Sequence, residues 1–171
     1  MSAPAALVKL LEPWSALYSD SKVVPTIVVF GHIAALVFAG GLAVAMDRAT
    51  LRAARGSPEI RARHLDELSA AHRLVIGGLA LSAVTGVLLF TADVETFFTS
   101  KVFWTKATMI ALLLSNGYAM TRAEARLHSE DEEADAALVE ASWRRLRTTA
   151  RVSLLLWFAI AFAGVTLAEA G

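Results

Sequence analysis

The sequence predicts an all-α fold: a bundle of four transmembrane helices, preceded by an amphipathic helix that lies on the membrane surface. Four long stretches are almost free of charged residues, and each has close to the roughly 20 residues that cross a bilayer as a helix. All twelve arginines fall in residues 47–73 and 122–151, between those stretches, whereas the four lysines lie elsewhere. Because an excess of basic residues in alternate connections marks the cytoplasmic side, the arginines predict the orientation.

The composition indicates an apolar environment and excludes several kinds of chemistry. Of the 171 residues, 56% are hydrophobic, against about 45–50% in soluble domains. The absence of cysteine excludes disulfides, thiolate catalysis and iron–sulfur clusters. The length of the chain suits one integral membrane domain, residues 1–171.

The first two predicted spans are residues 24–46 and 73–92. The first is longer than the hydrocarbon core requires, so it is expected to cross with some tilt. The second is just long enough. Between them, residues 47–72 form a cytoplasmic segment, and Pro58 followed by Glu59 favours the start of a helix that runs into the second span.

The third and fourth predicted spans are residues 102–121 and 151–168. The third includes Lys106, about one turn inside the outer boundary, because the charge-free part after it is too short to cross alone. Treating it as a re-entrant segment would place the two arginine-rich stretches on opposite sides of the membrane. The intervening residues 122–150 are predicted to be cytoplasmic, with a helix from Ala136 into the fourth span.

Both termini are then predicted to face outward, and residues 93–101 form a short external turn. The acidic patch at residues 130–135 favours a helix N-terminus, with a solvated linker as the alternative.

Residues 3–20 are predicted to form an amphipathic segment on the outer surface, with Trp14 and Tyr18 at headgroup level. Its apolar face comprises Leu7, Leu10, Leu11, Trp14, Leu17 and Tyr18.

Two stripes of small residues predict a close contact between the first and second spans. Lipid provides no hydrophobic drive for helix association, so helices in membranes pack where small residues let their backbones approach. The two stripes recur at four-residue spacing. They are Gly31, Ala35 and Ala39 in the first span, and Gly78, Ser82 and Gly86 in the second.

Two ionisable side chains, His32 and Lys106, lie inside predicted spans, where such groups are costly and mark functional sites. His32 is roughly 13 Å below the outer end of its span. It is a candidate axial ligand of a b-type haem, with Lys106 pairing with a propionate or another anion. The other hypotheses are a quinone or proton site and a plain hydrogen bond to a neighbouring span, with Lys106 snorkelling to headgroups.

The positions of the other histidines predict neither a second haem ligand nor a metal site. His72 begins the second span on the cytoplasmic side, so its height differs from that of His32 by roughly 20 Å. A haem would therefore be five-coordinate, or its sixth ligand would be neither histidine nor cysteine. His64 and His72 are eight residues apart rather than the four typical of helical metal pairs, so no metal site is predicted.

The run from Gly31 to Gly41, followed by Arg48, resembles the first-helix signature of small bacterial membrane families, in which a histidine precedes an aromatic-x-Gly-Gly step. CopD-like copper-resistance proteins and HemJ-type protoporphyrinogen oxidases share this signature. The later residues Thr85–Phe90, Phe103, Lys106 and Asn116 resemble those of small four-helix bacterial membrane families, and the two resemblances together cover about residues 24–121. The resemblance to HemJ-type proteins implies haem binding by His32.

We therefore expect a multi-pass protein of the bacterial inner membrane that takes part in redox or electron-transfer chemistry with haem b or a quinone. The alternative is a non-catalytic scaffold or accessory subunit of a homo-oligomer or larger membrane complex. A small-solute or ion permease is least favoured, because the spans lack paired carboxylates and helix breaks. The arginine-rich stretches are expected to contact the lipid bilayer, not nucleic acid.

Overall fold

The computed structural model describes residues 5–129 and 136–169, and within them it confirms the all-α prediction. The described residues form six helices and no strand. They are α1 (Ala5–Asp20), α2 (Val23–Ala53), α3 (Pro58–Ala92), α4 (Val94–Thr99), α5 (Lys101–Ser129) and α6 (Ala136–Glu169). The acidic patch at residues 130–135 lies outside the described residues.

Three of the described helices, α2, α3 and α6, are long and apolar enough to cross a membrane. Helix α5 has 29 residues, but Lys106 and Asn116 lower the hydropathy of its apolar stretch. Large apolar side chains also cover the outside of the bundle. Phe30, Leu155 and Phe162 each expose more than 70% of their surface, and exposed apolar area on this scale fits a lipid surrounding rather than water.

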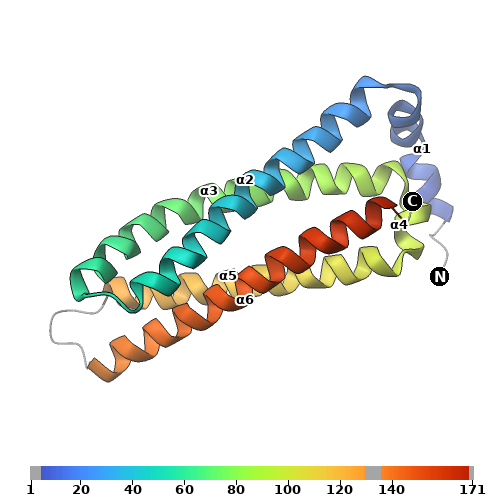
Figure 1. Ribbon diagram of the computed structural model, residues 1–171. Coiled ribbons are helices and arrows are strands. Elements are labelled where there is room, and N and C mark those ends of the chain that lie inside the picture. Colours follow the sequence, from blue (N-terminus) through green and yellow to red (C-terminus); the bar gives the residue numbers. More distant parts are fainter. Residues whose placement is uncertain (1–4, 130–135, 170–171) are drawn as a thin grey trace.

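The four long helices form two hairpins, α2 with α3 and α5 with α6 (Figure 1). Helix α2 packs on α6 and joins the hairpins, whereas α3 and α5 meet at few residues. Figure 1 shows α1 and α4 together at one end, which we call the α4 end. The α2–α3 connection lies at the other, which we call the arginine end because both arginine-rich stretches are there.

Local interactions set the helix boundaries. Helix α3 begins at Pro58, as the sequence predicts, after an extended Ser57 whose hydroxyl donates to Glu59. The connection at residues 93–101 differs from the predicted turn, because Val94–Thr99 coil into α4. The Asp93 carboxylate accepts a hydrogen bond from the backbone N–H of Thr96 and so caps this short helix.

Helix α1 packs against the neighbouring ends of α2 and α3. The Trp14 indole N–H donates to the Leu88 carbonyl at 3.0 Å, and the Ser15 hydroxyl donates to the Ala92 carbonyl at 2.7 Å. Trp14 is thus turned toward α3. Leu10 and Leu17, assigned to the same apolar face in the sequence, instead expose 75% and 53% of their surface. Helix α1 therefore has one side on the bundle and a second apolar side facing outward.

Small residues bring α2 and α3 into close contact. Ala39 is completely buried and Ala35 exposes only 4% of its surface. A Cβ atom added to Gly78 would lie 2.8 Å from the Ala39 Cβ, closer than real Cβ atoms approach. Further toward the α4 end, a Cβ added to Gly31 would lie 3.7 Å from the Thr85 methyl group. The two backbones are therefore as close as glycine allows at Gly78.

Replacing Gly78 by alanine is expected to destabilise the protein by about 1–3 kcal/mol, because the helices must separate to admit the new Cβ. Thermal or denaturant unfolding of the detergent-purified protein measures the effect. Gly77→Ala is the matched control, since its Cβ meets nothing within 4 Å and alanine favours a helix over glycine by up to about 1 kcal/mol. Equal stability of the two variants would contradict the close α2–α3 contact.

Candidate functional site

Buried polar side chains gather at two levels of the bundle. One level lies toward the α4 end and is centred on His32, the histidine singled out in the sequence. The other lies toward the arginine end and is centred on Glu124, which exposes 6% of its surface. The two levels are built from the same four long helices, but their chemistry differs.

His32 is held by α3 through one ring nitrogen. Its Nδ1 lies 3.1 Å from the Ser82 carbonyl oxygen and 3.0 Å from the Thr85 hydroxyl. The Thr85 hydroxyl itself donates to the Leu81 carbonyl at 2.8 Å. Because a carbonyl oxygen only accepts, Nδ1 carries the hydrogen and donates it. In the neutral imidazole, Nε2 then keeps its lone pair for another ligand.

One glycine lies beside the His32 ring and another beside Lys106. A Cβ added to Gly86 would lie 3.3 Å from His32 Cε1, and a Cβ added to Gly164 would lie 3.4 Å from Lys106 Nζ. Lys106 is near enough to His32 for their charges to interact. The structure thus brings together His32 from α2 and Lys106 from α5, with side-chain-free backbone of α3 and α6 beside them.

His32 and His72 lie at different levels. His32 is level with Ser82, and His72 lies ten residues before Ser82 on α3, a distance of roughly 15 Å along the helix. His72 also has a partner of its own, since its Nδ1 lies 2.8 Å from Glu124 Oε2. One porphyrin therefore does not reach both imidazoles.

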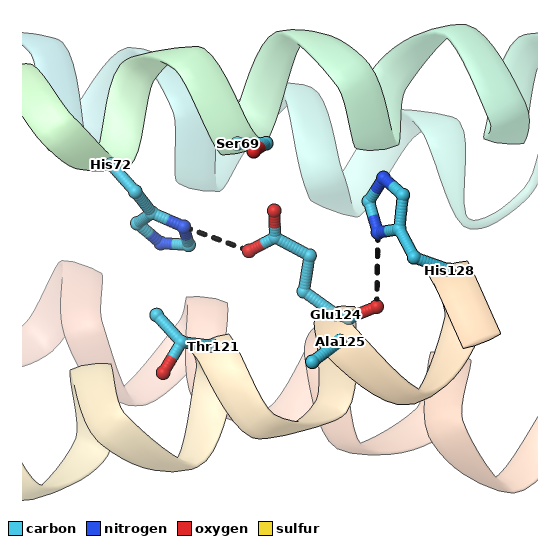
Figure 2. A pocket seen from close by; sticks show the side chains of 6 residues that line it. All are labelled: Ser69, His72, Thr121, Glu124, Ala125 and His128. Carbon is cyan, nitrogen blue, oxygen red and sulfur yellow. Dashed lines mark hydrogen bonds and ion pairs between the residues drawn. The ribbon is translucent and has the colours of Figure 1, made fainter.

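The His72–Glu124 pair borders an open groove of about 450 Å³ between α3 and α5 (Figure 2). Side chains of Ser69, Thr121, Ala125 and His128 complete its lining. The His72 side chain is 20% exposed and that of Glu124 only 8%. His128 Nδ1 donates to the Glu124 backbone carbonyl at 3.2 Å, on the other side of the carboxylate.

Two further polar residues of α2 are buried near this level. Thr50 is completely buried; its hydroxyl donates to the Met46 carbonyl and, at 2.8 Å, accepts from His64 Nε2. Asp47 exposes 3% of its surface, and its Oδ2 has no hydrogen-bond partner within residues 5–129 and 136–169. Ser153 of α6, which is also buried, is near enough to the Asp47 carboxylate to interact with it.

Sequence reasoning did not single out Asp47, Thr50 or Glu124 as site residues. Asp47 directly follows the first apolar run, and Glu124 stands between Arg122 and Arg126, positions that are typical of solvated residues. Only their burial distinguishes them, and burial depends on how the helices pack. Within the part of the chain that the structure describes, no three histidine or carboxylate side chains are close enough to hold a metal ion.

No protein-family model matches the chain, and neither a curated protein nor a solved structure is significantly similar to it. The geometry of these two levels is therefore what supports a function.

Replacing Glu124 by alanine is expected to destabilise the protein by about 1–3 kcal/mol, because it leaves the largely buried His72 imidazole without its partner. Unfolding of the purified protein measures the loss. Asp66→Ala serves as the control, since this carboxylate is 84% exposed and lies 3.8 Å from His128; a change below about 0.5 kcal/mol is expected there. Similar losses of stability in both variants would show that the buried His72–Glu124 pair stabilises the protein no more than the exposed His128–Asp66 contact does.

Proposed function

We propose that the protein is a four-span membrane protein that binds a b-type haem through His32 and takes part in electron transfer. The observation that carries this proposal is the orientation of the imidazole. Nδ1 donates to the Ser82 carbonyl, and a metal-ligating histidine commonly donates its other ring N–H to a carbonyl or carboxylate. Nε2 is thereby the nitrogen available to iron.

The charge of Lys106 and the hydrogen bonds of His32 support an anionic cofactor in this proposal. The absence of side chains at Gly86 and Gly164 leaves room for the His32 ring and the Lys106 ammonium group themselves. The Lys106 ammonium would pair with a haem propionate in an environment of low dielectric constant, where charge-assisted bonds are strong. Thr85, at 3.0 Å from Nδ1, would help to hold the ring orientation.

Haem supplies one-electron chemistry when bound, and the chain would supply ligation, orientation and electrostatics. Because His72 is on another level, His32 would be the only histidine ligand. The same pair of side chains also suits a quinone, whose carbonyl oxygens would accept hydrogen bonds from Lys106. The absorption spectrum separates these two cofactors.

In this proposal α5 is the fourth span. Its 29 residues extend roughly 44 Å, and α5 packs alongside α6 from one end of the bundle to the other (Figure 1). With α2, α3 and α6 crossing, α5 must also cross to keep both arginine-rich stretches at the same end. The positive-inside rule then places the arginine end in the cytoplasm of a bacterial cell and both termini outside.

A second candidate function, an accessory subunit of a membrane complex, is favoured by a separate observation. A Cβ added to Gly41, Gly77 or Gly117 would meet nothing within 4 Å, so these glycines are not needed for packing within the chain. Small residues on an outer face are typical of helix–helix contacts between subunits. Such a face would accept a second copy or another membrane protein.

Absorption spectra of the detergent-purified protein, oxidised and dithionite-reduced, test the haem proposal. We expect a Soret band that is lost in His32→Ala, because the iron loses its protein ligand. His128→Ala is the control and should keep the band, since this histidine lies at the arginine end. A colourless wild type, expressed with ample haem, would refute haem binding.

Single cysteines test the four-span topology without interference, because the chain has none of its own. Thr99→Cys lies just before α5 and His128→Cys near its end. We expect a membrane-impermeant maleimide to label the cysteine at position 99 in intact cells, and the one at position 128 only after permeabilisation. Labelling of both positions from the same side would contradict a membrane crossing by α5.

A further inference from the structure

Toward the arginine end, each of the four long helices contributes one polar side chain to the same buried region. These are Asp47 from α2, His72 from α3, Glu124 from α5 and Ser153 from α6. His72 bonds Glu124 at 2.8 Å and lies near enough to Asp47 for their charges to interact. The haem proposal uses none of these residues, and His32 is fifteen residues from Asp47 on α2, roughly 22 Å away.

The Asp47 carboxyl group lacks the partners that a buried charge needs. It exposes 3% of its surface, and among the described residues its Oδ2 has no hydrogen-bond partner. An ionised carboxylate in such a position costs several kcal/mol unless it is paired and fully hydrogen-bonded. The neutral acid removes most of that cost, so the site favours a bound proton.

The ionisable groups nearest to Asp47 are a histidine and carboxylates, and the neighbouring arginines lie outside this buried region. From α3, Asp47 faces His72, which in turn faces Glu124 from α5. Glu124 also interacts with His64. The flanking arginines point outward and are exposed: Arg48, Arg73, Arg122 and Arg151. On α6, Arg147 is bound to Glu140 at 2.7 Å.

His72 connects this buried carboxyl group with water. Its side chain and that of Glu124 line the open α3–α5 groove (Figure 2). An imidazole can accept a proton on one nitrogen and release one from the other. The alternative is a purely structural role, in which the His72–Glu124 bond holds together α3 and α5, two helices that make few other contacts. A structural role does not explain why the Asp47 carboxyl group is buried with an oxygen that lacks a partner.

We propose that Asp47, His72 and Glu124 form a proton-exchange site, in which the buried Asp47 carboxyl group takes up and releases a proton through His72 to water in the α3–α5 groove. His72 takes a proton from groove water and becomes an imidazolium ion, which the Glu124 carboxylate stabilises. Because no ion pair joins His72 to Asp47 among the described residues, the imidazolium passes one proton through an intervening water molecule to the Asp47 carboxylate and returns to the neutral form. The reverse sequence releases the same proton, and no electron moves.

Infrared spectroscopy of the full-length protein in detergent tests the site directly. We expect the C=O stretching band of a protonated carboxylic acid at near-neutral pH in the wild type, and its loss in Asp47→Asn. Asp66→Asn is the control, because that carboxylate is 84% exposed and its replacement should leave the band unchanged. Absence of the band from the wild type, or its persistence in Asp47→Asn, would overturn the proposal.

The path of proton exchange is tested by transferring the protein to D₂O. The C=O stretching band then shifts as deuterium replaces the proton of the carboxylic acid. In His72→Gln the shift is expected to slow by about a hundredfold, the usual scale of a lost acid–base group. Glutamine keeps an amide donor for Glu124, so the hydrogen bond between α3 and α5 is retained. If His72→Gln does not fold, Glu124→Gln takes its place, since it removes the charge that stabilises the imidazolium ion. Exchange as fast as in the wild type would overturn the role of His72.

Discussion

The close contact between α2 and α3 is the constraint on which both sites depend. Where Gly78 meets Ala39 there is no room for a further methyl group, so the two antiparallel helices have one axial register. That register places His32 beside Ser82 and Thr85 toward one end, and Thr50 beside His64 toward the other. A shift of one helical turn, about 5.4 Å, would break every one of these hydrogen bonds at once.

The second hairpin is joined differently, and this difference leaves the groove open. Helices α5 and α6 pack along their length, and the Asn116 amide donates to the Thr149 carbonyl at 2.9 Å. Helices α3 and α5, by contrast, meet near their ends. Phe90 stacks on Phe103 at 5.1 Å between centroids toward the α4 end, and His72 bonds Glu124 toward the arginine end. The α3–α5 side is therefore the side on which the groove at His72 and Glu124 opens.

The two levels show how one residue type acquires two roles from its neighbours. His32 donates to a backbone carbonyl, which fixes the tautomer and leaves Nε2 unprotonated in the neutral ring. His72 donates to a carboxylate, and a second, buried carboxyl group lies near it. In our two proposals, the first environment holds a haem and the second exchanges a proton.

The sequence by itself determined the four long helices, the apolar runs of α2, α3 and α6 and the start of α3, because these follow from composition and local pattern along one segment. It also identified His32 and Lys106 as ionisable groups in apolar runs, and the small residues of α2 and α3, since both signals are local. Only the tertiary structure decided that Asp47 and Glu124 are buried, that His72 meets Glu124 and that residues 94–99 coil into α4. Burial and pairing between helices depend on their relative rotation and register, which many side chains set together and no single segment encodes.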